Sequence, residues 1–189
     1  MENEGIEAKE RILTTVIGML TEGMDVNKLT IRMIAERASV NSALINYYFQ
    51  TKENLLVKAV EACMLKMSDM IYEKDTQDEP PADRVRRILK NIATFSLNHY
   101  TLAEFAISVE LKHGCFYSTQ TIMYMLRRIY QKTKTDVEIK LMALQLIAPL
   151  QVMLLSAKEY QGYLQEDIFD EAKRGELIDI MIDNVMREA

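Results

Sequence analysis

The sequence predicts an all-α protein of about nine helices, and three observations support this fold class. Apolar residues recur at spacings of three and four along almost the whole chain, which is the spacing of one helix face. The 189 residues include only three prolines and six glycines, so few positions interrupt a helix. No segment alternates apolar and polar residues as a half-buried strand does.

The helical segments follow one another in order, and several have a recognisable start or end. The first has its apolar face between Ile12 and Leu20 and is expected to stop near Gly23, since glycine tolerates a left-handed backbone. Thr30 and Thr51 each precede a helical pattern and are predicted N-caps. Further helices are expected near residues 30–37, 41–47, 51–72, 85–99, 102–114, 122–129, 136–160 and 174–187.

The organisation is two-part. Short helices with tight turns occupy the first quarter of the chain, and longer helices fill the rest. We place the domain boundary between residues 50 and 51, which gives domains of residues 1–50 and 51–189. The clearest loop, 76–82, lies within the second domain and contains two prolines.

The composition is that of a globular protein, with 49% hydrophobic and 27% charged residues. The acidic start lacks the apolar run of a signal peptide, so we expect a cytoplasmic protein. The longest apolar stretch, Leu141–Leu155, is interrupted by polar residues and a proline, and it is shorter than the roughly 20 residues of a membrane span. The two cysteines and two histidines lack the spacing of a zinc site. We therefore expect no membrane association, metal or cofactor.

Charge by itself gives no indication of nucleic-acid binding. The net charge is −5, and the first 58 residues contain seven lysines and arginines against eight acidic residues. Any argument for DNA binding must therefore rest on local geometry.

The segment Ile31–Phe49 has the pattern of a helix-turn-helix. Ala35 in the first short helix is small, as a crossing helix requires, and Ile45 and Tyr48 lie at helical spacing in the second. In a DNA-binding helix-turn-helix the second helix enters the major groove. The run that follows, Asn46-Tyr47-Tyr48-Phe49-Gln50-Thr51-Lys52-Glu53-Asn54-Leu55, continues the pattern into the next helix.

With this run, residues 8–58 resemble the TetR family of repressors. Two positions depart from the family pattern. Ser39 replaces the glycine often found at the turn, at a cost of about 1 kcal/mol if the backbone there is left-handed. Asn46 replaces a frequent tyrosine, which alters contacts with DNA rather than the fold.

The resemblance implies roles for eight residues. Thr30, Tyr47, Tyr48 and Lys52 would contact phosphates, and Asn41, Ser42, Ala43 and Asn46 would face the groove. Other interpretations stay open for four of these residues: Thr30 also suits a cap alone, Tyr47 and Tyr48 also suit packing, and Lys52 also suits simple solvation.

No charged residue occurs between Ala38 and Thr51, so this helix has no arginine to bind guanine. We expect base readout through asparagine amides and through Ala43 on a thymine methyl group. We also expect modest affinity that depends on dimer formation.

The resemblance also implies a ligand pocket and a dimer interface in the remainder of the chain. Leu141–Leu155 is too apolar for burial on one side, and Leu177–Met186 has a wide apolar stripe. Two such helices from each subunit can form a four-helix bundle across a twofold axis. The alternative is that both helices belong to the internal core.

The sequence does not identify the ligand. Methionine lines adaptable pockets, and the chain has 13 of them. The candidate lining residues are Met64, Met67, Phe95, His99, Phe105, Tyr124 and Met125, each of which also suits plain core packing.

These observations predict a homodimeric transcriptional repressor that leaves a palindromic operator when a small molecule binds. A helical dimer that binds proteins instead of DNA is the main alternative. An enzyme would need a pair such as Cys115 and His99 with an orienting acid, and no suitable loop accompanies them, so we expect no catalytic site.

Overall fold

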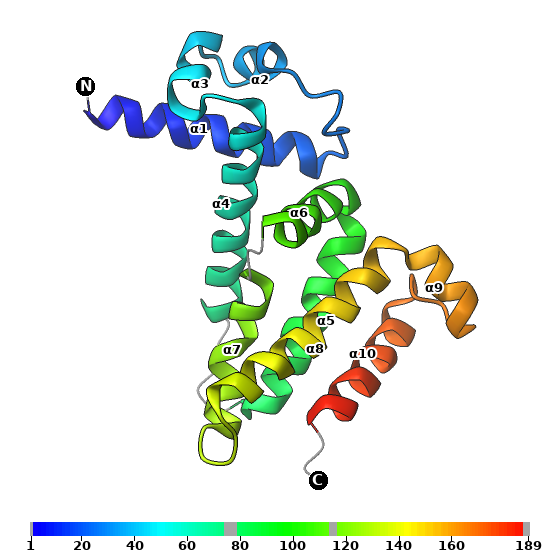
Figure 1. Ribbon diagram of the computed structural model, residues 1–189. Helices are drawn as coiled ribbons and strands as arrows, with labels where there is room; N and C mark the ends of the chain where they lie inside the picture. The colour runs from blue at the N-terminus through cyan, green and yellow to red at the C-terminus, as the bar shows by residue number, and fades with distance from the viewer. Residues whose placement is uncertain (1, 74–78, 114–116, 187–189) are drawn as a thin grey trace. The chain divides into compact units, whose positions relative to one another are not determined.

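The computed structural model describes the backbone of residues 2–73, 79–113 and 117–186, and the side chains of residues 6–63, 79–112 and 117–186. Within these ranges the chain forms helices and no strands, which confirms the all-α prediction (Figure 1). Ten helices are described rather than nine, because the segment expected as one helix at 136–160 is divided at Ser156. Their bounds are α1 Glu2–Thr21, α2 Ile31–Arg37, α3 Ser42–Phe49, α4 Lys52–Glu73, α5 Pro81–Asn98, α6 Tyr100–His113, α7 Tyr117–Tyr130, α8 Asp136–Leu155, α9 Ala157–Leu164 and α10 Glu171–Met186.

The chain divides into two compact units. The N-terminal unit comprises Met1–Asp69 and His99–His113, and the C-terminal unit comprises Met70–Asn98 and Gly114–Ala189. Helix α6 therefore belongs with the first helices although it follows α5 in the sequence. The division expected at residue 50 marks the end of the helix-turn-helix, whereas the compact units divide the chain within α4.

In the N-terminal unit, α2 and α3 lie across the same side of α1 (Figure 1). The apolar face predicted for α1 is buried, with Ile12, Val16 and Leu20 fully inaccessible. Helix α1 ends at Thr21, and Gly23 follows with a φ of +86°, which is the left-handed stop that the sequence predicted.

The turn between α2 and α3 is tight because small side chains line it. Ala35 and Ala38 are buried, and the Val40 N–H donates to the Ala35 carbonyl at 2.9 Å. Ser39 has a φ of +52°, so the left-handed backbone that favours glycine is present at this serine.

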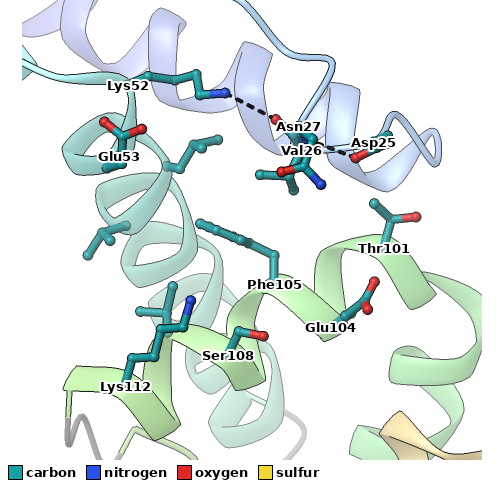
Figure 2. A pocket seen from close by; sticks show the side chains of 13 residues that line it. Asp25, Val26, Asn27, Lys52, Glu53, Thr101, Glu104, Phe105, Ser108 and Lys112 are labelled. Carbon is teal, nitrogen blue, oxygen red and sulfur yellow. Dashed lines mark hydrogen bonds between the residues drawn. The ribbon is translucent and has the colours of Figure 1, made fainter.

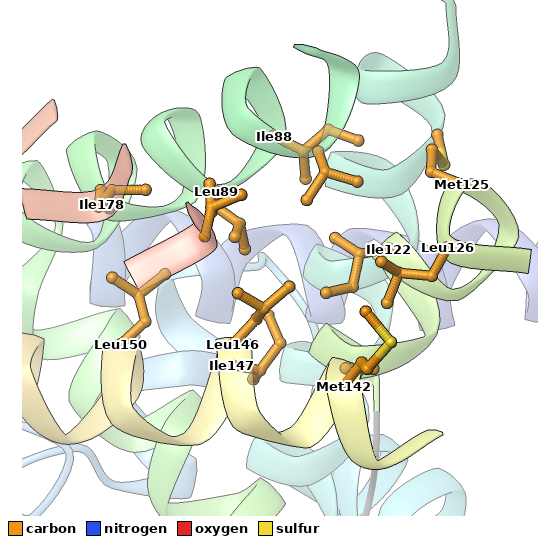
Figure 3. Packing of buried hydrophobic residues seen from close by; sticks show 14 of the residues in the cluster. Ile88, Leu89, Ile122, Met125, Leu126, Met142, Leu146, Ile147, Leu150 and Ile178 are labelled. Carbon is orange, nitrogen blue, oxygen red and sulfur yellow. The ribbon is translucent and has the colours of Figure 1, made fainter. Parts of the chain in front are cut away.

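The C-terminal unit is built around one hydrophobic core (Figure 3). Ile88 and Leu89 of α5, Met125 of α7 and Leu146 of α8 are almost completely buried there, with Ile178 of α10. Four helices thus supply the centre of a core whose packing depends on side chains far apart in the sequence.

Helix α8 begins with a capping box, in which Thr135 and Glu138 each bind the other's backbone. By length and composition alone its 20 residues would suffice to cross a membrane. Nine of them are buried in the C-terminal unit, which accounts for the hydrophobicity of one face. The opposite face presents exposed apolar side chains, which we call the α8 stripe: Val137, Leu141, Leu144 and Val152.

A buried arginine ties α10 to its surroundings. The Arg174 guanidinium donates to the carbonyls of Ile168 and Phe169 at 2.9 and 3.2 Å and to the Thr94 hydroxyl at 3.0 Å. The cation is 4% exposed, and each of these three acceptors is neutral. Arg174 therefore fixes the loop before α10 against α5.

Candidate nucleic-acid interface

Both short helices of the N-terminal unit begin at a capping side chain. The Thr30 hydroxyl accepts a hydrogen bond from the Met33 N–H at 3.2 Å, and the Asn41 side-chain oxygen accepts one from the Ala43 N–H at 2.8 Å. Thr51 does the same for α4 by accepting from the Asn54 N–H. The caps predicted at Thr30 and Thr51 are confirmed, and the cap at Asn41 is an addition.

Helix α3 buries one face and exposes the other. Ile45 and Phe49 are buried in the unit, whereas Ala43, Asn46 and Tyr47 are exposed, Tyr47 by 78%. The predicted short exposed helix is therefore present in the structure. Its surface can enter a groove without unpacking the unit.

The cap at Asn41 limits what this residue can read. Its side-chain oxygen is committed to the backbone of α3, which leaves the amide N–H donors. Bidentate recognition of adenine needs both the oxygen and the nitrogen of an amide. Ser42 is half-buried. Asn46 is thus the asparagine of α3 best placed for the predicted adenine contact.

Exposure to solvent decreases along the aromatic run from Tyr47 to Phe49. The rings of Tyr47 and Tyr48 meet edge to face with centroids 5.2 Å apart, and Tyr48 meets Phe49 in the same way at 6.3 Å. Tyr48 is half-buried between an exposed ring and a buried one. Both interpretations of Tyr48 therefore stay open, and the outward position of Tyr47 favours a phosphate contact.

Lys52 is more internal than the sequence indicated. The half-buried Lys52 donates through its ammonium to the Val26 carbonyl at 3.4 Å (Figure 2) and to the Leu29 carbonyl at 3.1 Å. Two of its three donors thus hold the loop that leads to Thr30. A phosphate contact by Lys52 stays a prediction, supported by the third donor alone.

Two exposed cations near α2 were missed by the sequence reasoning. Lys28 and Arg32 flank Thr30 in the sequence, and neither forms an ion pair with any residue that the structure describes. Arg37, by contrast, is paired with Glu22. The signal that could have identified the two cations is their position within two residues of a predicted N-cap, where phosphates are bound.

The candidate effector contacts do not converge on one described cavity. Phe105 lines a groove in the N-terminal unit, and Tyr124 lines a groove between α7 and α8. The Arg128 guanidinium lies 5.8 Å from the centroid of the Tyr124 ring. Met125 is 0% exposed and belongs to the core of the C-terminal unit. Phe95 and His99 are half-buried.

Three residues named in the sequence reasoning lie outside what the structure describes. The side chains of Met64 and Met67 are not among the described residues, and neither is Cys115.

The two predicted interface helices differ. In α10 the wide apolar stripe is used inside the C-terminal unit, because Ile178 and Ile182 are buried and Leu177, Met181, Val185 and Met186 pack against the same core. The exposed large apolar residue of α10 is Ile180. Most of the apolar stripe of α10 therefore belongs to the internal core, as the alternative interpretation expected. The side chains of the α8 stripe are exposed to solvent.

Comparisons with known proteins agree with this geometry. Residues 23–59 match the family model described as bacterial regulatory proteins, tetR family. None of the curated proteins compared with the chain matches it.

Three solved structures are similar over nearly the whole chain. FadR from Thermus thermophilus, a TetR-family repressor in complex with lauroyl-CoA, has a TM-score of 0.70 at 17% identity and covers 96% of this chain and 97% of its own. RolR in complex with resorcinol has a TM-score of 0.66 at 18% identity, covering 100% and 97%. BioQ with its double-stranded DNA operator has a TM-score of 0.65 at 13% identity, covering 94% and 96%. At these identities the likeness establishes the fold.

Proposed function

Since residues 23–59 match the family model of the tetR family of bacterial regulatory proteins, we propose that the chain is a ligand-responsive, homodimeric repressor of transcription of that family. It binds a palindromic operator through α3 and leaves it when a small molecule binds. Such a regulator acts on DNA in the cytoplasm, and a catalytic role is not part of the proposal.

The observation that carries the proposal is the exposed face of α3. Ile45 and Phe49 hold the helix, so Ala43 and Asn46 are free to meet base edges in the major groove. Tyr47 then lies at the far end of the helix and donates its hydroxyl to a phosphate. Thr30, Lys28 and Arg32 add phosphate contacts at the start of α2.

The α8 stripe is the proposed dimer interface. Exposed apolar side chains at Val137, Leu141, Leu144 and Val152 recur on one face over four turns, and a second copy related by a twofold axis buries them. The same axis relates the two α3 helices, which is why a palindromic operator is expected.

Effector control is proposed from two similar proteins, one solved with lauroyl-CoA and one with resorcinol. An effector releases the operator only to the extent that it binds the DNA-free arrangement more tightly. Phe95 of the C-terminal unit and His99 of the N-terminal unit, both half-buried, are each retained as a separate candidate contact.

The test is selection of DNA by the full-length protein from a random library, followed by anisotropy titrations between about 50 and 200 mM salt. We expect a palindromic site, weaker binding at higher salt, and A·T pairs opposite Asn46 and Ala43.

Tyr47→Phe should weaken binding roughly tenfold, because each subunit loses one hydrogen bond to a charged acceptor. Failure to select any palindrome would favour the protein-binding alternative.

A further inference from the structure

A groove of about 450 Å³ lies within the N-terminal unit and does not include α3 (Figure 2). Residues 25–27 of the loop before α2, residues 52–57 of α4 and residues 101–112 of α6 supply its lining. Its size falls in the range of small-molecule sites, which is roughly 300–1,000 Å³. Nothing in the DNA-binding role of the unit requires a groove here.

An aromatic ring lies at the centre of the groove. The side chain of Phe105 extends from α6 into the space between α4 and the loop before α2 (Figure 2), and it is half-buried. Val57, which is half-buried, and Leu56 and Val109, which are buried, also line the groove. The ring and these side chains suit a ligand with an apolar body, and the face of the ring attracts a positive charge.

Three carboxylates surround this apolar surface, one from each lining element. Asp25 lies in the loop, Glu53 in the first turn of α4 and Glu104 in α6 next to Phe105, and all three are exposed. None of them forms an ion pair with a residue that the structure describes. Glu53 and Glu104 are therefore available to a cation from solution, whereas one oxygen of Asp25 already accepts a hydrogen bond from the Asn27 N–H at 2.8 Å (Figure 2).

The two cations of the groove offset this charge only in part. The ammonium of Lys52 is held by two backbone carbonyls of the loop. Lys112 is exposed at the far end of α6 from Thr101, toward one side of the groove (Figure 2). The sign of the surface around Phe105 is thus set by the carboxylates.

From this arrangement we propose that the groove binds an organic cation with an aromatic or apolar body. The cationic centre sits against the Phe105 ring near Glu104, and the apolar body packs on the half-buried side chain of Val57. Phe105 is among the effector contacts that the sequence suggested, whereas Phe95 and His99, which the proposed function retains, do not line this groove. The cation site stands whether or not the chain represses transcription.

The test compares two probes of the same shape and opposite charge. Tetraphenylphosphonium and tetraphenylborate are titrated into the full-length, DNA-free protein by calorimetry. We expect the phosphonium to bind at least tenfold more tightly than the borate. Equal affinities, tighter binding of the borate, or no phosphonium binding would overturn the proposal, and the second of these would assign the groove to anions through its lysines.

Charge variants then locate the bound cation. Glu104→Gln should weaken phosphonium binding about three- to fivefold, and Lys112→Gln should strengthen it by a similar factor. Phe105→Leu, which keeps the apolar volume but removes the ring, should weaken it by about the same amount. Glu159→Gln on α9 of the other unit is the matched control and should leave the affinity unchanged.

The opposite shifts of Glu104→Gln and Lys112→Gln keep the test decisive even if Phe105→Leu loosens α6. Both positions are exposed, so neither variant should alter the melting temperature. A phosphonium affinity that neither charge variant shifts would place the cation elsewhere and rule out the groove.

Discussion

The two units of this chain hold their helices by different means. In the N-terminal unit, α2 and α3 have seven and eight residues, too few to be stable alone, and each begins at a capping side chain. In the C-terminal unit, α5, α8 and α10 have 16 to 20 residues and are held by a shared core. Local signals therefore specify the first unit, and burial of apolar surface specifies the second.

This difference explains why the sequence indicates the DNA-binding helix-turn-helix but does not locate an effector pocket. A cap or a tight turn requires a particular residue type at one position, so Thr30 and Ala35 can be interpreted directly. A core requires only apolar residues of suitable volume, so many sequences satisfy it. A pocket in such a unit leaves little trace in the sequence.

The largest expected effect is that of a change in the C-terminal unit on DNA binding by the N-terminal unit. The double variant Leu141→Gln with Leu144→Gln places polar groups on the α8 stripe. The protein should become monomeric, and operator affinity should fall about a hundredfold or more, because the two α3 helices then bind independently. Sedimentation velocity and anisotropy measure the two effects.

Tyr163→Gln on α9 is the control for this variant, because it also replaces an exposed apolar residue but lies off the stripe. Its oligomeric state and operator affinity should stay those of the parent protein. A double variant of α8 that remains dimeric would remove the stripe from the interface.

The next effect concerns the C-terminal unit alone. Arg174→Leu leaves the carbonyls of Ile168 and Phe169 and the Thr94 hydroxyl without their donor inside the unit. The free energy of unfolding should fall by about 3 kcal/mol. Urea unfolding measures it, with the exposed neighbour Lys173→Leu as the control. A loss below about 1 kcal/mol would mean that water replaces the guanidinium.

The contrast between local signals and burial also explains which features of the structure could be predicted from the sequence. Gly23 located the C-terminal end of α1, and helix periodicity located the buried positions Ile34 and Ile45, because these depend on neighbours close in sequence. Asn41 carried a cap signal, yet we assigned it only to the groove. Its place directly before a helix was the indication that we overlooked.

The C-terminal unit was harder to predict from the sequence for another reason. Tyr124 and Met125 are adjacent, but the first is 53% exposed and the second 0%, since one step along a helix turns the side chain by about 100°. The apolar stripe of α10 was legible, but the sequence does not tell whether its partner helix comes from the same chain or from another. Only the packing of α10 on α5 and α8 decides this.

A smaller effect is expected at two left-handed backbone positions, one in each unit. Ser39 in the N-terminal unit and Gln165 in the C-terminal unit both have left-handed backbones, with φ of +52° and +57°. Replacing either with glycine should stabilise the protein by about 0.5–1 kcal/mol, because relief of strain exceeds the entropy that glycine adds to the unfolded chain. Thermal unfolding measures the gain. A loss of stability at Ser39 would show that its side chain supports the turn.

The smallest effect is electrostatic and depends on pH. Arg87 donates to Glu79 through Nε at 3.0 Å and through Nη2 at 2.7 Å, and these bonds hold the pKa of Glu79 below its ordinary value of 4.5. A carboxylate with a lowered pKa stabilises the folded state above that ordinary value, and the contribution is lost as the pH falls below it. Glu79→Gln should therefore cost about 0.5–1 kcal/mol at pH 7, and the difference from the parent should close as the pH falls below 4.5. Urea unfolding at pH 7 and at stepwise lower pH measures it, with Glu159→Gln as the control. A difference that persists unchanged in acid would mean that Glu79 acts through packing rather than through its charge.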